Sequence, residues 1–539
     1  MDRFNCLYIK IFNYPNSNHF TAWLVMELRV ELLLIITGGS RIAIISEKTA
    51  SLLGVHSSDR IRIKYRNQEM IAIANIAEYF SDKRIGLYVE TAKALGVSED
   101  ETVTVKLAPL PESLFNVRAK LHGERLREKD LATIVQDVVE RHLSNAEIAA
   151  FLTALSINGL STSENEALSR AMVATGKTLN FGKGPILDKH SVGGIPGDKT
   201  SMLVVPIVAA AGFTIPKTSS RAITSPAGTA DRVEVLCPVN LAIEEIKDVV
   251  AKTNGCLVWG GSLELAPADD LFIQVEYPLG IDPMLLPSIL SKKKAIGATH
   301  VAIDIPTGMA AKIKTRTEAY SLASDFVDLG KRLGLSIQCA LTFGDQPLGC
   351  CIGPALEAGE ALTTLMGGGP PDLRDKAVSL AGMLFEMVGV EDGRAKAEEM
   401  LDSGKAEAKM REIIAAQGGN SKIKIDDLLV GNKMAEVRSE DAGKVIWLST
   451  DDIVRIAREA GAPKEKGAGM VLHAKLGENV HKGDVLFEVY AERSSKLASA
   501  LELAKQLSPI VLTKKPAEKM ILDQVPEKLA HEKSFMLDR

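Results

Sequence analysis

Apolar and charged side chains alternate along much of the chain between residues 26 and 109. Segment 61–66 places an apolar side chain at every second position, and this is the period of a half-buried strand. Segments 68–76 and 102–107 repeat the pattern, and a Pro-Leu-Pro sequence then ends it. We therefore expect a β-rich N-terminal domain over residues 26–109, folded as a small barrel or sandwich.

A helical period replaces this alternation over residues 110–185. Ser144–Glu147 fits a capping box and precedes apolar residues at helical spacing. Ser163–Glu166 fits a second capping box, ahead of a helix expected to end near Gly176. Because this stretch has no cluster of ionisable groups, it predicts scaffold helices rather than catalytic ones.

From residue 186 to 430, short apolar runs alternate with longer helical patterns. Segments 301–305 and 335–341 are typical of buried strands, whereas 317–333 and 373–388 have a helical period. Such alternation indicates a largely parallel sheet with helices packed on it.

Residues 431–539 form the last region, after a change of character at the Gly-Gly-Asn sequence 418–420. Strand-like runs between Gly467 and Ala491 resemble the barrel-sandwich fold of lipoyl and biotinyl carriers. The exposed lysine-centred hairpin of a carrier is missing, so we expect a structural C-terminal domain of the α+β type.

Composition narrows the class of protein. The length of 539 residues predicts three or four domains, and the net charge of −5 gives no basic surface for nucleic acid. The only membrane-like stretch, residues 24–36, is shorter than the roughly 20 residues of a membrane span and carries charged side chains. Six cysteines without a Cys-x-x-Cys pair favour reduced, buried thiols and a cytoplasmic location. Residues 1–25 lack the features of a signal peptide, and we expect a disordered extension or a mis-called start there.

The densest polar and glycine-rich segment is Asp188–Ser201, which precedes an apolar, helix-compatible run at 202–211. A glycine-rich turn before a helix N-terminus binds anions, because its free N–H groups and the helix dipole favour negative charge. Lys189 adds a cation, and the hydroxyl groups of Ser191 and Ser201 add hydrogen-bond donors. We therefore expect an anion site here.

Within this segment, Gly193–Thr200 differs from a P-loop at one position, because Asp198 replaces the second glycine. A carboxylate repels phosphate and lacks the backbone freedom of glycine. No metal-binding aspartate at the end of an apolar strand completes a nucleoside triphosphatase, so that alternative is disfavoured.

A second donor-rich loop covers residues 218–231. It contains six hydroxyl side chains and one arginine, Arg221, whose guanidinium fork matches the oxygens of a phosphate group. Two separate anion-binding loops imply two phosphates, or one phosphate and a phosphorylated substrate.

Three motifs occur in order along the chain. They are Asp-Lys-His-Ser-x-Gly-Gly at 188–194, Ser-x-Arg to Gly-Thr at 219–229, and Ser-Ile-Leu-Ser-Lys-Lys at 288–293. In this order they resemble the thymidine phosphorylase family, and the resemblance covers residues 112–520. The Thr-Ser-Ser-Arg-Ala-Ile-Thr-Ser sequence, the Trp-Gly-Gly sequence 259–261 and the added N-terminal domain resemble its archaeal AMP phosphorylase branch.

The resemblance implies an α/β fold built from two lobes between the N-terminal and C-terminal domains. The helical lobe is expected over 110–185 and 278–297. The α/β lobe, with a mixed or parallel sheet and the phosphate site, is expected over 186–277 and 298–430.

Binding residues also follow from the resemblance. Those that hold inorganic phosphate are Lys189, Ser191, Ser201, Ser219 and Thr229. Those that contact the nucleotide are Gly194, Ser220, Arg221, Ala222, Ile223, Thr224, Ser225, Thr229, Ser288 and Lys312. Lys292 matches a lysine that pyrimidine enzymes of the family use on the base.

Asp282 matches the proton donor of the family. Burial beside the apolar residues 283–285 would raise its pKa and keep it protonated, whereas the alternative is a helix N-cap. His190 is a second candidate, either as an acid or as a hydrogen-bonded partner of the phosphate, and an ordinary structural histidine is equally open.

One departure from the family concerns the base. The pyrimidine enzymes carry an arginine shortly before the Ser-Ile-Leu-Ser-Lys sequence to hold the base carbonyl groups, but segment 274–280 of this chain has no arginine. Thymine or uracil recognition is therefore in doubt, and a purine or a broader range of bases is easier to accept.

The resulting hypothesis is a nucleotide phosphorylase that converts AMP and phosphate to adenine and ribose 1,5-bisphosphate, and also accepts CMP and UMP. We expect no metal or cofactor, no nucleic-acid or membrane partner, and a homodimer or larger homo-oligomer. The alternatives are a thymidine or pyrimidine-nucleoside phosphorylase, a phosphoribosyltransferase, and a non-catalytic assembly protein.

Overall fold

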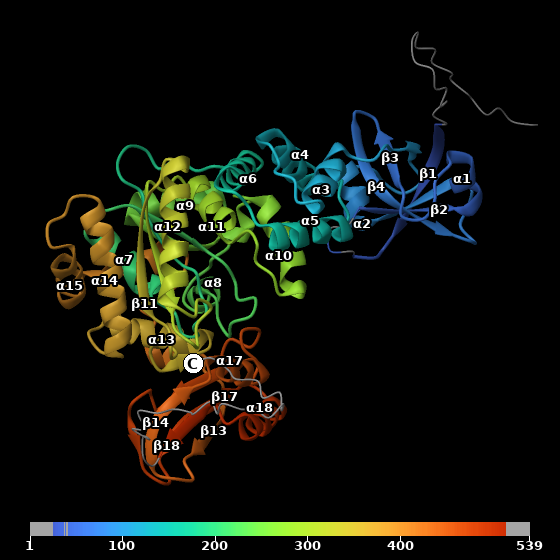
Figure 1. Ribbon diagram of the computed structural model, residues 1–539. Coiled ribbons are helices and arrows are strands. Elements are labelled where there is room, and N and C mark those ends of the chain that lie inside the picture. The colour runs from blue at the N-terminus through green and yellow to red at the C-terminus, as the bar shows by residue number, and fades with distance from the viewer. Residues whose placement is uncertain (1–24, 37, 39–40, 514–539) are drawn as a thin grey trace, which may run out of the picture.

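The chain folds as a β-barrel, a helical lobe, an α/β lobe and a C-terminal domain (Figure 1). This computed structural model describes residues 25–36, 38 and 41–513, so the expectation for residues 1–25 lies almost entirely outside the described residues. Within the described ranges, no helix is both long and apolar enough to cross a membrane. The described cysteines are free, and two of them, Cys237 and Cys256, are buried.

The N-terminal region is a closed barrel with the strand order β1-β5-β2-β4-β3-β6. The alternation in the sequence turns apolar side chains such as Ile61 and Ile63 into the barrel, where both are fully buried. Of the two expected folds, a barrel or a sandwich, the barrel is therefore correct. Its elements are β1 (Met26–Leu33), β2 (Ile42–Ser46), α1 (Glu47–Leu53), β3 (Arg60–Tyr65), β4 (Gln68–Ala77), β5 (Arg84–Tyr88), α2 (Val89–Leu95) and β6 (Thr102–Leu107).

Two arginines attach the barrel to the helical lobe. Arg60 is 6% exposed, is ion-paired with Glu147, and donates to the carbonyl oxygen of His142 at 2.9 Å. Arg41 donates to the carbonyl oxygen of Glu140 at 2.6 Å. Glu147 also accepts from the main-chain N–H of Ser144, so one carboxylate both caps a helix and holds the barrel.

The helical lobe begins with α3 (Glu112–Leu121), α4 (Glu128–Val139), α5 (Asn145–Asn158) and α6 (Thr162–Ala174). The expected capping box opens α5. The box of α6 is formed instead by Ser161 and Glu164, two residues before the expected pair. Ser161 has extended backbone angles, as an N-cap requires, whereas Ser163 already lies inside the helix.

Helix α10 (Pro267–Leu279) also belongs to the helical lobe, although we expected residues 267–277 in the α/β lobe. Its Phe272 is fully buried beside Phe151 of α5, with ring centroids 6.1 Å apart. Helix α11 (Leu285–Ala295) packs on α6 and on the sheet core. A helical period predicts a helix but does not say which core it joins.

The α/β lobe has a parallel sheet with apolar clusters on both faces. Strands β11-β10-β7 pair in parallel, β8 pairs with β9 in parallel, and a parallel bridge between Ile186 and Thr214 joins the two groups. The strands are β7 (Leu187–Ser191), β8 (Ile215–Ser219), β9 (Gly255–Trp259), β10 (His300–Thr307) and β11 (Ser336–Phe343).

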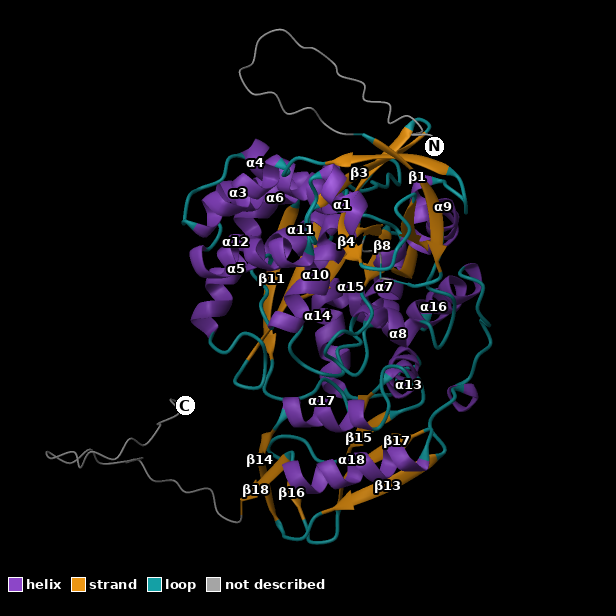
Figure 2. Ribbon diagram, turned by 90° about the vertical axis from the view of Figure 1, so that its right-hand side faces the viewer, coloured by secondary structure: helices purple, strands orange, loops and turns teal. Residues whose placement is uncertain are grey.

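Helices surround these strands (Figure 2). The apolar run expected to be a helix at 202–211 forms α7, and the expected helices at 317–333 and 373–388 form α12 and α14. The helices are α7 (Ser201–Ala210), α8 (Thr229–Val233), α9 (Ile243–Thr253), α12 (Arg316–Leu333), α13 (Pro354–Leu365), α14 (Pro371–Met387), α15 (Gly393–Asp402) and α16 (Lys405–Ala416).

The C-terminal domain combines two sheets, β12-β15-β17-β13 and β16-β14-β18, with two helices. This is the expected α+β type. Its elements are β12 (Cys351–Ile352), β13 (Lys433–Arg438), β14 (Gly443–Leu448), α17 (Thr450–Glu459), β15 (Gly469–Leu472), β16 (Asn479–Val480), β17 (Val485–Ala491), α18 (Ser494–Leu507) and β18 (Ile510–Thr513).

Candidate active site

The two donor-rich segments meet at one edge of the sheet. Ser191 is the last residue of β7 and Ser219 is the last residue of β8. Because the strands are parallel, these carboxyl ends lie at the same edge, where α/β sheets bind their ligands. The motif Asp188–Ser191 was expected in a loop but lies within β7, where it pairs with β10.

Lys189 lies in a buried network of charges. Its Nζ atom is 3.5 Å from Asp198 and 3.7 Å from Asp304. Lys376 is 2.8 Å from Asp304 and adds a second ammonium group. Although burial raises the pKa of Asp198, Lys189 and Lys376 hold it well below its usual range. Asp198 is therefore a counter-ion for two lysines, a different role from that of the glycine it replaces in a P-loop.

A neighbouring carboxylate, Asp188, serves two further lysines. Lys293 is 2.6 Å and Lys217 is 3.7 Å from its oxygens, and all three side chains are buried. Burial, together with the charge of Lys293, lowers the pKa of Lys217 to about 7. Two ammonium groups share one carboxylate, so this region favours an added negative charge.

His190 is surrounded by the same lysines. Burial, followed by the charges of Lys293 and Lys217, lowers the pKa of His190 well below its ordinary value. The imidazole is thus neutral near pH 7 and has no spare proton to give as an imidazolium. Of the roles left open by the sequence, hydrogen-bonded partner fits this environment and acid does not.

The loop at 220–228 closes on itself and leaves its donors accessible. The carboxylate of Asp231 accepts from the main-chain N–H groups of Ala222 at 2.7 Å and Gly228 at 3.0 Å. A Cβ atom on Gly228 would lie 2.6 Å from the Ala222 nitrogen, so this closure requires glycine. Ser220 and Thr224 are exposed and free to face a ligand.

Arg221 has a different environment from the one expected. Its guanidinium donates to both carboxylate oxygens of Glu234, at 2.7 and 2.5 Å, and lies 5.0 Å from the centroid of the Trp259 ring. The Arg221 guanidinium lowers the pKa of Glu234 to about 2. The fork is therefore occupied, and a phosphate group has to compete with Glu234 for it.

The C-terminal domain holds two site segments, a role that the sequence did not indicate. Arg458 of α17 donates to the carbonyl oxygens of Ile223 at 3.0 Å and Ser225 at 3.2 Å. Thr450 donates to the carbonyl of Ala310 at 2.6 Å, two residues before Lys312. No local pattern marks such contacts, because the partners are more than a hundred residues apart.

Gly194, Lys312 and Asp282 come together from three segments. Gly194 has φ of +99°, and a Cβ atom there would lie 2.4 Å from the Lys312 nitrogen, so only glycine permits this approach. The Lys312 ammonium group is ion-paired with Asp282. This pair links the segment before α11 to the loop after β10.

The burial expected for Asp282 is wrong. Its side chain is 39% exposed, because the link between α10 and α11 turns Met284 into the core and leaves Asp282 on the outside. The N-cap alternative is also wrong, since Met284 is the N-cap of α11 and makes no side-chain cap.

Two expected site residues share a carboxylate that the sequence did not single out. They are Ser288, expected to contact the nucleotide, and Lys292, expected to contact the base. Ser288 donates to Asp269 at 2.9 Å, and Lys292 lies 2.6 Å from the same oxygen and 3.2 Å from Asp270. Although burial opposes it, these two carboxylates raise the pKa of Lys292. Asp269 thus positions both side chains.

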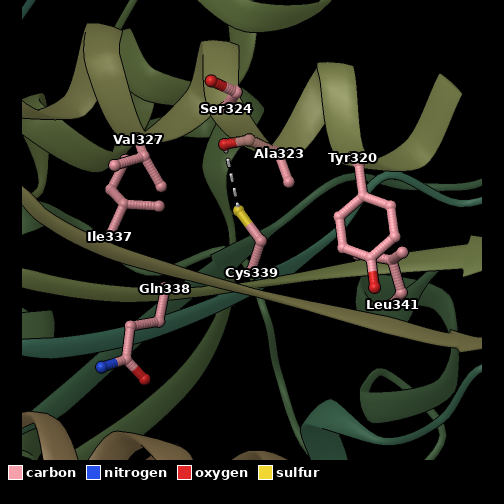
Figure 3. A pocket seen from close by; sticks show the side chains of 8 residues that line it. All are labelled: Tyr320, Ala323, Ser324, Val327, Ile337, Gln338, Cys339 and Leu341. Carbon is pink, nitrogen blue, oxygen red and sulfur yellow. Dashed lines mark hydrogen bonds between the residues drawn. The ribbon is translucent and has the colours of Figure 1, made fainter. Parts of the chain in front are cut away.

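A surface hollow of about 480 Å³ lies elsewhere, between α12 and β11 (Figure 3). Tyr320 and Val327 of α12 face Ile337 and Cys339 of β11, and the thiol donates to the Ala323 carbonyl at 3.7 Å. None of the expected site residues lines it.

Three family descriptions match successive parts of the chain. They are the helical bundle domain of a glycosyl transferase family at 117–176, the a/b domain of that family at 183–407, and the pyrimidine nucleoside phosphorylase C-terminal domain at 445–511. The chain is therefore a glycosyl transferase with the domain set of the nucleoside phosphorylases, and the expected fold class is confirmed.

Relatives of known name define the family more closely. The AMP phosphorylase of Thermofilum pendens is 48% identical over 89% of this chain and 94% of its own length. That of Pyrococcus furiosus is 48% identical over 90% of this chain and 97% of its own length. That of Methanocaldococcus jannaschii is 48% identical over 84% of this chain and 91% of its own length. The chain belongs to the AMP phosphorylase family.

Proposed function

We propose that this protein cleaves AMP with inorganic phosphate to give adenine and ribose 1,5-bisphosphate, and that it also accepts CMP and UMP. The observation that carries the proposal is the meeting of two anion-binding segments, 191–201 and 219–229, at one carboxyl edge of the sheet. One segment suits the attacking phosphate and the other suits the phosphate of the nucleotide. The relatives named AMP phosphorylase support a nucleotide and phosphate as the two substrates.

The residues take the following roles in the proposal. Lys189, Ser191, Ser201, Ser219 and Thr229 hold inorganic phosphate. Gly194, residues 220–225, Thr229, Ser288 and Lys312 hold the nucleotide, while Lys292 contacts the base. Asp282 delivers the proton, and His190 is a neutral hydrogen-bonding partner.

The reaction needs position and charge more than a nucleophilic side chain. A phosphate oxygen attacks C1′, the bond from C1′ to the base nitrogen breaks, and that nitrogen takes a proton. Holding the two substrates in line supplies on the order of 7 kcal/mol or more of the barrier. The lysine-rich network favours the phosphate anion, and a proton from a carboxyl group makes the base a better leaving group.

We further propose that phosphate is the only co-substrate and that no metal or cofactor takes part. Among the described residues, one group, Asp137, Glu140 and His142, has ligand atoms near enough to hold a metal ion. It lies at the end of α4, away from the sheet edge, and His142 is already 2.9 Å from Asp137. Dialysis against a chelator tests the proposed independence from metal, and activity should be unchanged after it. We also propose that the protein is a cytoplasmic homo-oligomer, dimeric or larger.

A substrate panel tests the proposed function. The protein is incubated with phosphate and AMP, CMP, UMP or thymidine, and base release is measured. Base release from the monophosphates but not from thymidine is expected. Release from thymidine alone would identify a nucleoside phosphorylase, magnesium-dependent consumption of adenine with a diphosphorylated ribose would identify a transferase, and no reaction would favour an assembly protein.

The Lys189→Ala variant should raise the phosphate KM by about tenfold or more, since a hydrogen bond to a charged group contributes about 1.5 to 3 kcal/mol. The AMP KM should change much less. Because Lys189 also lies beside Asp198 and Asp304, the thermal midpoint is measured in parallel. An unchanged phosphate KM would contradict the assignment.

Phosphate binding near pH 8 should be accompanied by proton uptake at Lys217. The pKa of Lys217 is about 7 without the anion, so the group is mostly neutral at pH 8, and a nearby phosphate raises that pKa. Titration calorimetry in two buffers of different ionisation enthalpy measures the uptake. The same uptake in Lys217→Met would assign the proton to another group.

A further inference from the structure

Glu276 is a buried carboxyl group on the last turn of α10. Its side chain is 6% exposed, and its Oε1 atom is buried without a hydrogen-bond partner among the described residues. Leaving an ionised carboxylate in such a place is costly, whereas a protonated carboxyl group has a much smaller penalty.

The charges around Glu276 also favour its protonated form. Burial raises the pKa of Glu276 to about 8, and the negative charges of Asp282 and Asp269 act in the same direction. Lys312 opposes them more weakly. Helices α4, α5 and α6, which pack on α10, contribute apolar side chains to this core and no compensating charge acts on Glu276 from them.

Asp282 lies in the opposite situation. It is accessible and ion-paired with Lys312, as suits a group that reaches a substrate. In the proposed function, Lys312 binds the nucleotide. Asp282 then loses its counter-ion. The chain turns back after α10, so that the N–H of Ile281 donates to the carbonyl oxygen of Glu276 at 3.4 Å, and the negative charge of Asp282 acts on Glu276. Two carboxyl groups coupled in this way and without a cation retain one proton between them.

We propose that Glu276 is a positioning residue that shares one proton with Asp282, and that this carboxyl pair supplies the proton for the departing base. The inference rests on the proposed function and deepens it. As the phosphate oxygen bonds to C1′, the electron pair of the breaking C1′–N bond takes the proton from Asp282. The pair becomes doubly ionised and regains one proton from water after the products leave.

The dependence of kcat on pH tests the pair. The wild-type kcat should fall as pH rises through about 8, because the shared proton is lost. In Glu276→Gln the fall should move to lower pH by about one unit or more, and kcat at pH 7.5 should drop about tenfold or more. Glu276→Asp keeps a carboxyl group and should recover part of the loss. An alkaline limb unmoved in Glu276→Gln would overturn the proposal.

An activated substrate separates proton delivery from damage to the fold. The 4-nitrophenyl β-riboside 5-phosphate has a leaving group that departs without protonation. Glu276→Gln should cleave it at close to the wild-type rate while losing activity on AMP. Equal losses on both substrates would show a structural role and overturn the inference. If wild-type protein releases no adenine from AMP, the proposed function itself fails, so the two failures are distinct.

Stability gives an independent check. The pKa of Glu276 is raised in the folded protein, so the folded state binds more protons than the unfolded state between about pH 4.5 and 8. The stability linked to this proton is present at low pH and is lost as pH rises through about 8. Glu276→Gln cannot ionise, and its thermal midpoint should therefore fall less than that of the wild type between pH 6 and 9. An equal fall in both proteins would place the ionised group elsewhere and contradict the proposal.

Discussion

Asp282→Asn should lower kcat by about a hundredfold to ten-thousandfold, the range that a positioned general acid contributes. Asparagine has the shape of aspartate but cannot give the departing base a proton of comparable acidity. The KM for phosphate should stay close to the wild-type value, because Lys189 and Lys376 are paired with Asp198 and Asp304, whereas Asp282 is paired with Lys312. The KM for AMP should stay equal or fall, since the Lys312 ammonium group loses its ion-pair partner and is free for the nucleotide.

Adenine release at saturating phosphate and AMP measures this change. A matched control is Asp375→Asn, which removes an exposed carboxylate paired with Arg394 at 2.8 Å on the outer helices, and which should keep wild-type kinetics. Turnover of Asp282→Asn close to that of the wild type would remove Asp282 from the chemistry.

Arg232→Ala should lower the free energy of unfolding by about 3 to 5 kcal/mol, the usual effect of removing one partner of a buried ion pair. Arg232 is 5% exposed and its partner Glu357 is fully buried, with 2.5 Å between them. The guanidinium also donates to the carbonyl oxygens of Asp198 and Ala227, both at 2.8 Å. One side chain thus ties both anion-binding segments to α13.

The thermal midpoint and the KM values of both substrates measure this second change. Both KM values should rise together, because both segments lose the same support. Arg438→Ala is the control, since this exposed arginine pairs with Glu436 at the surface and such pairs contribute less than about 1 kcal/mol. An unchanged midpoint in Arg232→Ala would show that Glu357 finds another partner.

The sequence predicts the architecture well where a local period decides the outcome. Strand β6 has the expected bounds of 102–107, and α5 begins at the expected capping box. The hydrophobic period of a segment does not predict which domain core that segment packs into. Helix α10 was assigned to the α/β lobe for that reason, although Phe272 packs beside Phe151.

The candidate site shows the same limit. Glycines and hydroxyl groups within one loop reveal an anion site, because their chemistry is local. The ion pairs that set the charge of the site are not local: Lys293 and Asp188 lie 105 residues apart. Asp282 was expected to be buried because its neighbours are apolar. Glu276 stands between Val275 and Tyr277 in the sequence, and only the fold shows that its carboxyl group is buried.

The attachment of the barrel has a consequence for motion. Arg60 and Glu147 fix the barrel to the start of α5, and the barrel lies at the far end of the molecule from the C-terminal domain (Figure 1). Two-lobed enzymes commonly close by hinge rotation. A barrel fixed to the helical lobe would rotate with that lobe, and its displacement would be large because it lies far from the hinge. Fluorophores on the barrel and on the C-terminal domain would therefore report a small rotation as a much larger change in separation than probes beside the substrates.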